Sequence, residues 1–337
     1  MADNAQSPDT ATRSLSDSFR QQLQQAEAEI SKVIIGQHGM IQTIFCALLA
    51  KGHVLLEGVP GLAKSLTVAT FARLIGGTFK RIQFTPDKLP SDITGTTVYN
   101  QATATFSFNQ GPVFCNILLA DEINRAAPKV QSALLEAMQE KVVSIDRDQY
   151  PLPDPFMVLA TMNPVEQLGT YPLSEAQLDR FIAKVELSYP KETDEALLLH
   201  KKSRDFEAIQ KAVPQLLTTE QVLAMQLHVA EQVSIADRVI AYLLAICLRT
   251  RPQSPQAGGA VGKYIAVGIS PRGGEHLIAF CKGHAFLQGR DFVSFEDVDA
   301  CAAAVLGHRL ILSDAAFLEG VRPAEMIREI ISGISPY

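Results

Sequence analysis

The segment that most constrains the fold is GVPGLAKS, residues 58–65. It lies between a short apolar run, HVLLE at 53–57, and a helical pattern that begins at Lys64. Its glycines let the backbone curl so that successive N–H groups point inward, and the N-terminus of the following helix adds partial positive charge. A strand, a glycine-rich loop and a helix in this order form a phosphate-binding loop. The segment therefore predicts an α/β fold that binds phosphate at the end of a strand.

Lys64 and Ser65 supply the side chains that such a loop needs. The Lys64 ammonium can reach the β- and γ-phosphate oxygens of ATP, and the Ser65 hydroxyl can ligate Mg²⁺. Ala63 replaces the glycine normally found before the lysine, and we expect it to be tolerated if residue 63 already has right-handed helical dihedral angles. The alternative is a structural turn without a ligand. The predicted nucleotide-binding residues of the loop are Gly58, Val59, Pro60, Gly61, Leu62, Ala63, Lys64, Ser65 and Leu66.

A second motif, ILLADE at residues 117–122, ends an apolar run in two carboxylates. A buried parallel strand delivers such residues to the carboxyl edge of the sheet, where open α/β folds bind their ligands. We expect Asp121 to hold the Mg²⁺ shell, and Glu122 to orient and deprotonate the attacking water. Taken alone, the pair could be an exposed acidic strand end. The Lys64 loop favours the catalytic interpretation.

Up to about residue 190, short apolar runs alternate with helical segments, which predicts a mostly parallel sheet covered by helices on both faces. The five expected strands are residues 53–57, 79–84, 116–120, 157–161 and 183–187, with helices such as 64–75 and 128–140 among them. After Pro190 the pattern is helical to the end. The predicted divisions are a flexible polar tail at 1–14, an α/β core at 15–190 and an all-helical domain at 191–337.

The composition of the chain limits the classes of protein to which it can belong. The 337 residues include 30 Lys and Arg against 36 Asp and Glu, a formal charge of −6, without the basic surplus that is typical of a nucleic-acid binder. No apolar run reaches the ~20 residues of a bilayer span, and the N-terminus has no apolar signal-peptide core. We therefore expect a cytoplasmic protein with no stable membrane insertion. The five cysteines lie in apolar context without zinc-site spacing, so we expect reduced core residues.

Two segments inserted in the core have the alternation of β-hairpins, near residues 95–110 and 141–155. The first contains no Lys or Arg. The second has only Lys141 and Arg147 against three aspartates. Nucleic-acid motors grip phosphates with basic hairpins, so this charge pattern disfavours a nucleic-acid partner.

Four segments, in this order, resemble the MoxR family of AAA+ ATPases: GVPGLAKS, LLADEINRAAPKVQSALLEAMQE, ATMNP and LSEAQLDRF. The likeness covers about residues 34–272 and is most specific between residues 58 and 181. It implies an AAA+ P-loop core, with a five-stranded, mostly parallel sheet, followed by a helical lid. It also implies ATP and Mg²⁺ as cofactors and a ring assembly, a hexamer, that hydrolyses ATP. The clients would be proteins that are remodelled or matured, with von Willebrand factor A-type domain proteins as the expected partners.

The resemblance assigns further residues to the nucleotide site. Val33, Ile34 and Gly36 would form the hinge on the adenine side. Asn163 would be the sensor-1 residue that helps Glu122 to hold the water. A turn before Pro164 is the structural alternative for Asn163.

The same resemblance assigns two arginines. Arg180 would be the arginine finger, acting on the neighbouring subunit, and Arg272 the sensor-2 residue that reaches the γ-phosphate from the lid. Alternatively, Arg180 could pair within its own helix and Arg272 could only fasten the lid to the core. Gln83 could restrain Glu122 until a client binds, and Arg125 is either an interface cation or a solvated loop residue. A nucleic-acid motor related to ring helicases, or a scaffold that senses ATP without hydrolysing it, stays as an alternative function.

Overall fold

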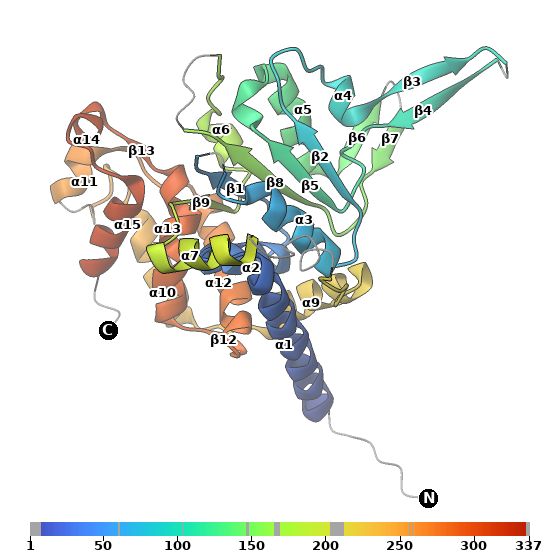
Figure 1. The fold of residues 1–337 in the computed structure, drawn as a ribbon. Coiled ribbons are helices and arrows are strands. Elements are labelled where there is room, and N and C mark those ends of the chain that lie inside the picture. Colours follow the sequence, from blue (N-terminus) through green and yellow to red (C-terminus); the bar gives the residue numbers. More distant parts are fainter. Residues whose placement is uncertain are drawn as a thin grey trace, which may run out of the picture.

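The computed structural model describes residues 8–334 apart from residues 60, 103, 146–147, 165–168, 203–211, 256 and 258. Its α/β core is built on a five-stranded sheet, as predicted, and all four strand pairs in that sheet are parallel. The strands are β1 (Val54–Glu57), β2 (Phe79–Gln83), β5 (Ile117–Asp121), β8 (Met157–Met162) and β9 (Ala183–Glu186), in the order β2-β5-β8-β1-β9 (Figure 1). Since parallel strands end at a common edge, the segments that follow them are brought together there.

Alternate residues of β5 bury against different helices. Leu119 belongs to the apolar cluster that contains Phe71 of α3 (Lys64–Leu74), whereas Leu118 belongs to the cluster that contains Leu134 of α5 (Pro128–Glu140). Because successive strand side chains point to opposite faces, α3 and α5 cover opposite faces of the sheet. This double burial explains why β5 has a continuous apolar sequence.

The N-terminal helix is longer than the sequence predicted. α1 (Pro8–Val33) begins inside the segment expected to be a flexible tail, and residues 1–7 of that tail lie outside the described part of the chain. Leu23 and Ile30 bury one face of α1. Once such a face has formed a helix, each further residue adds a backbone hydrogen bond without a new nucleation step. The apolar pattern therefore marks the buried part of the helix and not its beginning.

Two hairpins leave the core at the expected places. After a single turn of helix, α4 (Ser91–Thr94), strands β3 (Gly95–Asn100) and β4 (Thr105–Gln110) form a ribbon that projects far beyond the sheet (Figure 1). β6 (Val142–Ile145) and β7 (Asp148–Pro151) form the second hairpin. The rings of Phe108 and Tyr150 stack at 4.2 Å, so the bases of the two hairpins are in contact.

The predicted helical lid is present among the described residues after Pro190, with two short ribbons in addition. The helices are α7 (Glu192–Lys202), α9 (Thr219–Gln232), α10 (Asp237–Arg249), α11 (Gly259–Tyr264), α12 (Pro271–Leu287), α13 (Phe295–Leu306), α14 (Asp314–Leu318) and α15 (Pro323–Ser332). β10 (Ser234–Ile235) pairs with β12 (Phe292–Val293), and β11 (Ile265–Val267) pairs with β13 (Ile311–Leu312). β11 lies in the Pro/Gly-rich segment between Arg251 and Ser270, for which the sequence indicates a loop or short ribbon. The other three strands were not expected, because strands of two residues are too short to show a period of two.

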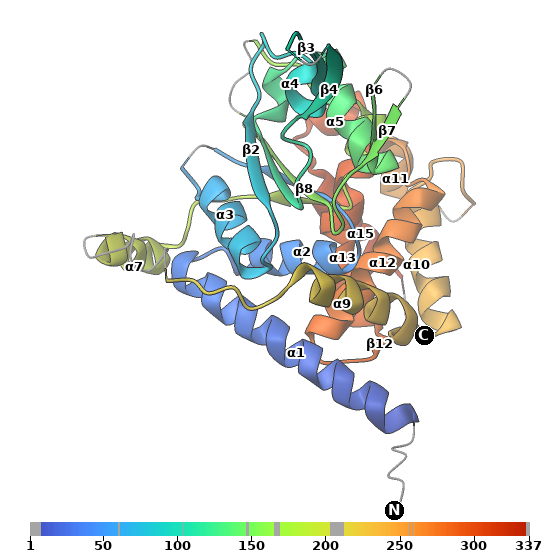
Figure 2. The same ribbon diagram turned by 90° about the vertical axis from the view of Figure 1, so that its right-hand side faces the viewer.

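The lid is joined to the core through α2 (His38–Leu49). Gln226 of α9 donates a hydrogen bond to the Leu48 carbonyl at 2.7 Å, and Gly283 of α12 lies against Cys46, where an added Cβ would be 3.0 Å from the Cys46 carbonyl oxygen. Figure 2 shows α1 running diagonally below α2 and α9. One apolar cluster continues from the α3 face of the sheet through α1 and α2 into the lid. The lid therefore has no apolar core separate from that of the sheet.

All five cysteines are buried and free, as predicted for core residues. No helix within the described ranges is long and apolar enough to cross a membrane.

Candidate nucleotide-binding site

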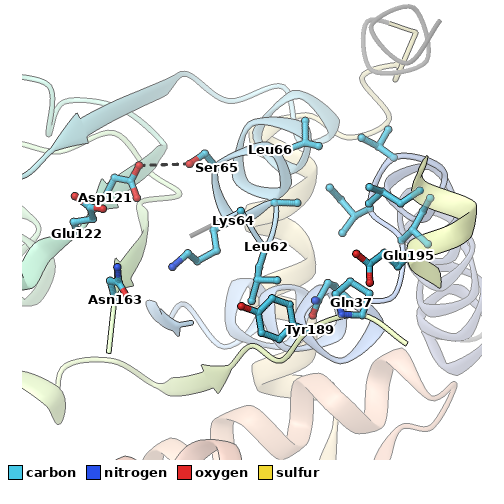
Figure 3. Close-up of a pocket in the computed structure, with 17 residues that line it drawn as sticks. Gln37, Leu62, Lys64, Ser65, Leu66, Asp121, Glu122, Asn163, Tyr189 and Glu195 are labelled. Carbon is cyan, nitrogen blue, oxygen red and sulfur yellow. Dashed lines mark hydrogen bonds between the residues drawn. The ribbon is translucent and has the colours of Figure 1, made fainter. Parts of the chain in front are cut away.

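A cavity of about 630 Å³ lies at the carboxyl edge of the sheet, a size that suits a small-molecule ligand (Figure 3). It brings together most of the predicted site residues: Val33, Ile34, Gly61, Leu62, Ala63, Lys64, Ser65, Leu66, Asp121, Glu122 and Asn163. Gly36, Gly58 and Val59 are described but are not among the residues that line the cavity. Pro60 lies outside the described residues.

The Lys64 side chain lies across the loop that precedes it. Its Nζ donates to the Gly58 carbonyl at 2.6 Å and to the Met162 carbonyl at 3.4 Å, so it links the loop to the end of β8. Partial burial lowers the pKa of Lys64, while the nearby carboxylates of Asp121, Glu122 and Glu57 act in the opposite direction. The loop therefore holds a cation next to two carboxylates of the cavity.

The condition expected for Ala63 is wrong. Residue 63 is the N-cap of α3 and has φ 57° and ψ 19°, which is left-handed and not right-handed helical. The reason is that α3 begins only at Lys64, so residue 63 still belongs to the loop. A side chain in this conformation costs about 1–2 kcal/mol relative to the right-handed one, so the loop is strained at this residue.

The Ala63→Gly substitution is therefore expected to raise the free energy of unfolding by about 0.5–1 kcal/mol. Relief of the left-handed strain exceeds the greater backbone entropy of glycine in the unfolded chain. Urea denaturation of both proteins measures the difference. Ala196→Gly, in the exposed part of helix α7, is the control and should lose about 1 kcal/mol. An equal decrease in the free energy of unfolding of both variants would show that the backbone is not strained at Ala63.

Asp121, at the end of β5, is buried and held by three side chains. Thr161 donates to its Oδ1 at 2.6 Å, and Ser65 donates to its Oδ2 at 3.4 Å (Figure 3). Arg81 of β2 donates to the same Oδ2 through Nη2 at 2.6 Å and Nε at 3.1 Å. Ser65 and Asp121 thus provide neighbouring oxygen atoms, which is the donor chemistry that Mg²⁺ takes.

Glu122 is held by two polar side chains. Gln83 Nε2 donates to its Oε2 at 2.7 Å, and Arg125 Nη1 donates to the same oxygen at 3.0 Å. The expected contact between Gln83 and Glu122 is present, and Arg125 is more than a solvated loop residue. Asn163, which is buried at the end of β8, lies on the same side of Lys64 as Asp121 and Glu122 (Figure 3).

On the opposite side of the cavity, the sequence predicted Val33 and Ile34 but not the other lining residues. Gln37, Tyr189, Pro190, Glu195 and Leu198 also line it, and Figure 3 shows Tyr189, Gln37 and Glu195 on the far side of Lys64 from the two acids. Tyr189 and Pro190 follow β9, and the rule that ligands bind where parallel strands end could have indicated them. Val33, Ile34 and Leu198, which are near Gln37 and Glu195 in the sequence, add apolar side chains to the cavity lining. The cavity thus has a charged end that suits phosphates and Mg²⁺, and it also has apolar and aromatic side chains against which a base can pack.

Arg180 and Arg272 lie elsewhere. Arg180 Nη1 donates to the Leu135 carbonyl at 2.7 Å, and Arg272 Nη1 lies 3.4 Å from Asp179 Oδ2. Both line a second cavity, of about 300 Å³, and neither is among the described residues that line the Lys64 cavity. Because Arg272 follows the first residue of α12, its contact with Asp179 links the lid to the core in this structure. The sensor-2 assignment stays a prediction.

Known proteins are similar to this chain in sequence and in fold. Residues 53–183 match the ATPase family associated with various cellular activities (AAA), and residues 259–330 match the AAA lid domain. The chain is 42% identical over 93% of its length to Chaperone MoxR1 of Mycobacterium tuberculosis, 82% of which is covered. It is 43% identical over 93% of its length to the uncharacterised protein YeaC of Bacillus subtilis, 94% of which is covered.

A crystal structure of a candidate ATPase from Cytophaga hutchinsonii superposes with a TM-score of 0.90 at 41% identity, covering 97% of this chain and 98% of that one. The fold is thus that of an AAA+ domain with a helical lid. Within that class, the chain belongs to the MoxR family of AAA+ ATPases, which confirms the resemblance seen in the sequence.

Proposed function

We propose that the protein binds ATP with Mg²⁺ in the Lys64 cavity and hydrolyses the ATP to ADP and phosphate. The observation that carries the proposal is the meeting of Lys64, Ser65, Asp121, Glu122 and Asn163, from three segments of the chain, in one cavity. Lys64 would hold the β- and γ-phosphates, and Ser65 and Asp121 would hold the metal shell. When bound, Mg²⁺ supplies positive charge that offsets the charge developing on the transferred phosphoryl group.

Glu122 is the proposed general base. Its carboxylate would accept a proton from the attacking water, which the Asn163 amide helps to position, since phosphoryl transfer depends on positioning and charge. Gln83 donates to Glu122 at 2.7 Å and would restrain it in the resting state. We propose that binding of a client releases this restraint.

We further propose a ring of subunits, a hexamer, in which Arg180 and Arg272 act on the nucleotide of the neighbouring subunit. Both arginines share a cavity that is separate from the Lys64 cavity of their own chain. Guanidinium groups suit phosphate because they donate two parallel hydrogen bonds and stay charged. In such a ring, the guanidinium groups of both arginines would contact the phosphates of the nucleotide bound by the neighbouring subunit.

The proposed clients are proteins, in particular those with von Willebrand factor A-type domains, which the ring would remodel or help to mature. The relative named Chaperone MoxR1 supports a protein client. The projecting β3–β4 ribbon carries exposed Tyr99 and Phe106 and no Lys or Arg. We also propose a cytoplasmic location, which suits five buried, free cysteines.

ATP with Mg²⁺ is expected to stabilise the wild-type protein much more than the Lys64→Ala variant. At a hundred times its dissociation constant, ATP should add about 2.7 kcal/mol to the native state, and the variant loses a main phosphate contact. Thermal melts with and without nucleotide measure this. Lys282→Ala, in the lid and outside both cavities, is the control and should respond as the wild type does. An equal shift in Lys64→Ala would show that Lys64 is not a major contact.

DNA and RNA are expected neither to bind tightly at physiological salt nor to stimulate hydrolysis. The β3–β4 ribbon contains no Lys or Arg that could bind the phosphates of a nucleic acid. Filter binding and an ATPase assay with single- and double-stranded nucleic acid test this. Sub-micromolar binding with a steep salt dependence would instead favour a motor related to ring helicases.

A further inference from the structure

We propose that Arg81 is an internal counter-cation of the metal site: it holds Asp121 in the metal-free protein and must leave Oδ2 before Mg²⁺ is bound there. The inference rests on the proposed function, because it takes Ser65 and Asp121 as the metal-binding pair. It adds a residue that neither the motifs nor the family resemblance assigned.

The geometry places Arg81 at the oxygen that matters. Both Arg81 donors, Nη2 at 2.6 Å and Nε at 3.1 Å, converge on Oδ2 of Asp121. Ser65 Oγ, the other proposed metal ligand, donates to this same oxygen at 3.4 Å, whereas Oδ1 is held by Thr161 at 2.6 Å. Oδ2 is therefore the Asp121 oxygen that faces Ser65, the other proposed metal ligand. In this structure its lone pairs accept the hydrogen bonds of the Arg81 guanidinium.

Charge explains why a cation is needed there when no metal is bound. Asp121 is buried and is followed in the chain by Glu122, so an unpaired carboxylate would face both desolvation and repulsion. The guanidinium offsets both costs. The Arg81 side chain is 53% exposed, so its guanidinium is already in contact with water and can leave Asp121 without being buried elsewhere. A divalent cation can then replace it at Oδ2.

Arg81 also connects the metal site to the catalytic glutamate. Its Nη2 donates to Oε1 of Gln83 at 3.0 Å, which leaves the Gln83 Nε2 group to donate to Glu122 at 2.7 Å. Arg81 and Gln83 lie two residues apart on β2 and therefore on the same face of the strand. Departure of Arg81 would remove the group that orients the Gln83 amide. Loading of the metal thereby removes one support of the contact between Gln83 and Glu122, which client binding would then release, and Arg81 acts as a positioning residue.

The test is a titration of Mg²⁺ at fixed fluorescent ADP, which reports binding without turnover. Arg81→Gln is expected to lower the half-saturating Mg²⁺ concentration about tenfold, equivalent to about 1.4 kcal/mol, because no guanidinium competes for Oδ2. Its metal-free protein should melt at a lower temperature. Affinity for ADP in EDTA should be unchanged, since Arg81 is not among the described residues that line the cavity.

Lys80→Gln is the matched control. It removes the same charge from the same strand, but Lys80 lies on the opposite face and donates to the Gly111 carbonyl at 3.4 Å. Its Mg²⁺ midpoint should equal that of the wild type. Arg81→Lys, which keeps the charge with a less suitable donor geometry, should lie between the wild type and Arg81→Gln, and it replaces Arg81→Gln if that variant does not fold.

An unchanged or higher Mg²⁺ midpoint in the Arg81 variants would overturn the proposal, as would an equal shift in Lys80→Gln. Weaker ADP binding in EDTA would show that Arg81 contacts the nucleotide instead and would also overturn it. In each of these cases the wild type still binds ADP with Mg²⁺. If the wild type itself shows no Mg²⁺-dependent binding, the proposed function fails together with the inference.

Discussion

The Glu122→Gln variant is expected to keep its affinity for ATP while its turnover falls by about 10²- to 10⁴-fold, the usual contribution of a general base. Glutamine has nearly the same size and can still face Gln83 and Arg125, but it cannot accept the proton of the attacking water. Ser65 and Asp121 remain 3.4 Å apart and can still organise the metal. Nucleotide titration and phosphate release, measured on the same preparation, separate the two effects.

Two variants serve as controls for Glu122→Gln. Asp121→Asn removes the carboxylate that contacts Ser65, so it should weaken Mg²⁺-dependent binding as well as turnover. Glu186→Gln changes an exposed carboxylate beside Lys184, outside the cavity, and should leave both unchanged. Wild-type turnover by Glu122→Gln would contradict the assigned base, and a scaffold or another base would then have to be considered.

Arg180→Ala is expected to show the largest loss, about 10³- to 10⁵-fold in turnover, with nucleotide binding retained. A cation that meets the charge developing on the γ-phosphate acts mainly in the transition state. In its own subunit Arg180 lies outside the Lys64 cavity and donates to the Leu135 carbonyl. Arg249→Ala is a matched control, because Arg249 also donates to a backbone carbonyl, that of Gly333 at 2.5 Å, but in the lid. Near-normal turnover by Arg180→Ala would contradict the finger assignment.

The parts of the fold that could be predicted are those whose pattern is local. All five strands of the sheet were expected to within one residue at each end. β1, β5 and β8 are buried apolar runs between turns, whereas the edge strands β2 and β9 are shorter apolar signals that are only partly buried. α5 (Pro128–Glu140) was expected with its observed ends because Pro128 suits the first turn. The ribbon of β10 (Ser234–Ile235) with β12 (Phe292–Val293) was not, because its partners are far apart in the chain and each is only two residues long.

The site residues that could be predicted are likewise those that belong to local patterns. Lys64, Ser65, Asp121 and Glu122 were predictable because their motifs are contiguous and follow strands. Arg81 was not, because its contact with Asp121 depends on the pairing of β2 with β5, which no local pattern specifies.

Two details of the site could not be derived from the sequence, for related reasons. The dihedral angles of Ala63 depend on where α3 begins within a loop. The distance of Arg272 from the Lys64 cavity depends on how the lid packs against the core, where Arg309 Nε also donates to Asp179 at 2.7 Å. Lid packing and helix starts are set by tertiary contacts that a single sequence does not display.

The central claim is that each site is completed by a neighbouring subunit, and phosphate release by mixed rings tests it most directly. Arg180→Ala subunits retain Glu122, and Glu122→Gln subunits retain Arg180. In rings mixed at random one to one, about a quarter of the interfaces should hold both groups, so about a quarter of wild-type turnover is predicted. A linear decline when wild type is mixed with either variant shows that sites act independently. With that control satisfied and mixing verified, turnover no higher than the sum of the two inactive proteins would contradict a shared site.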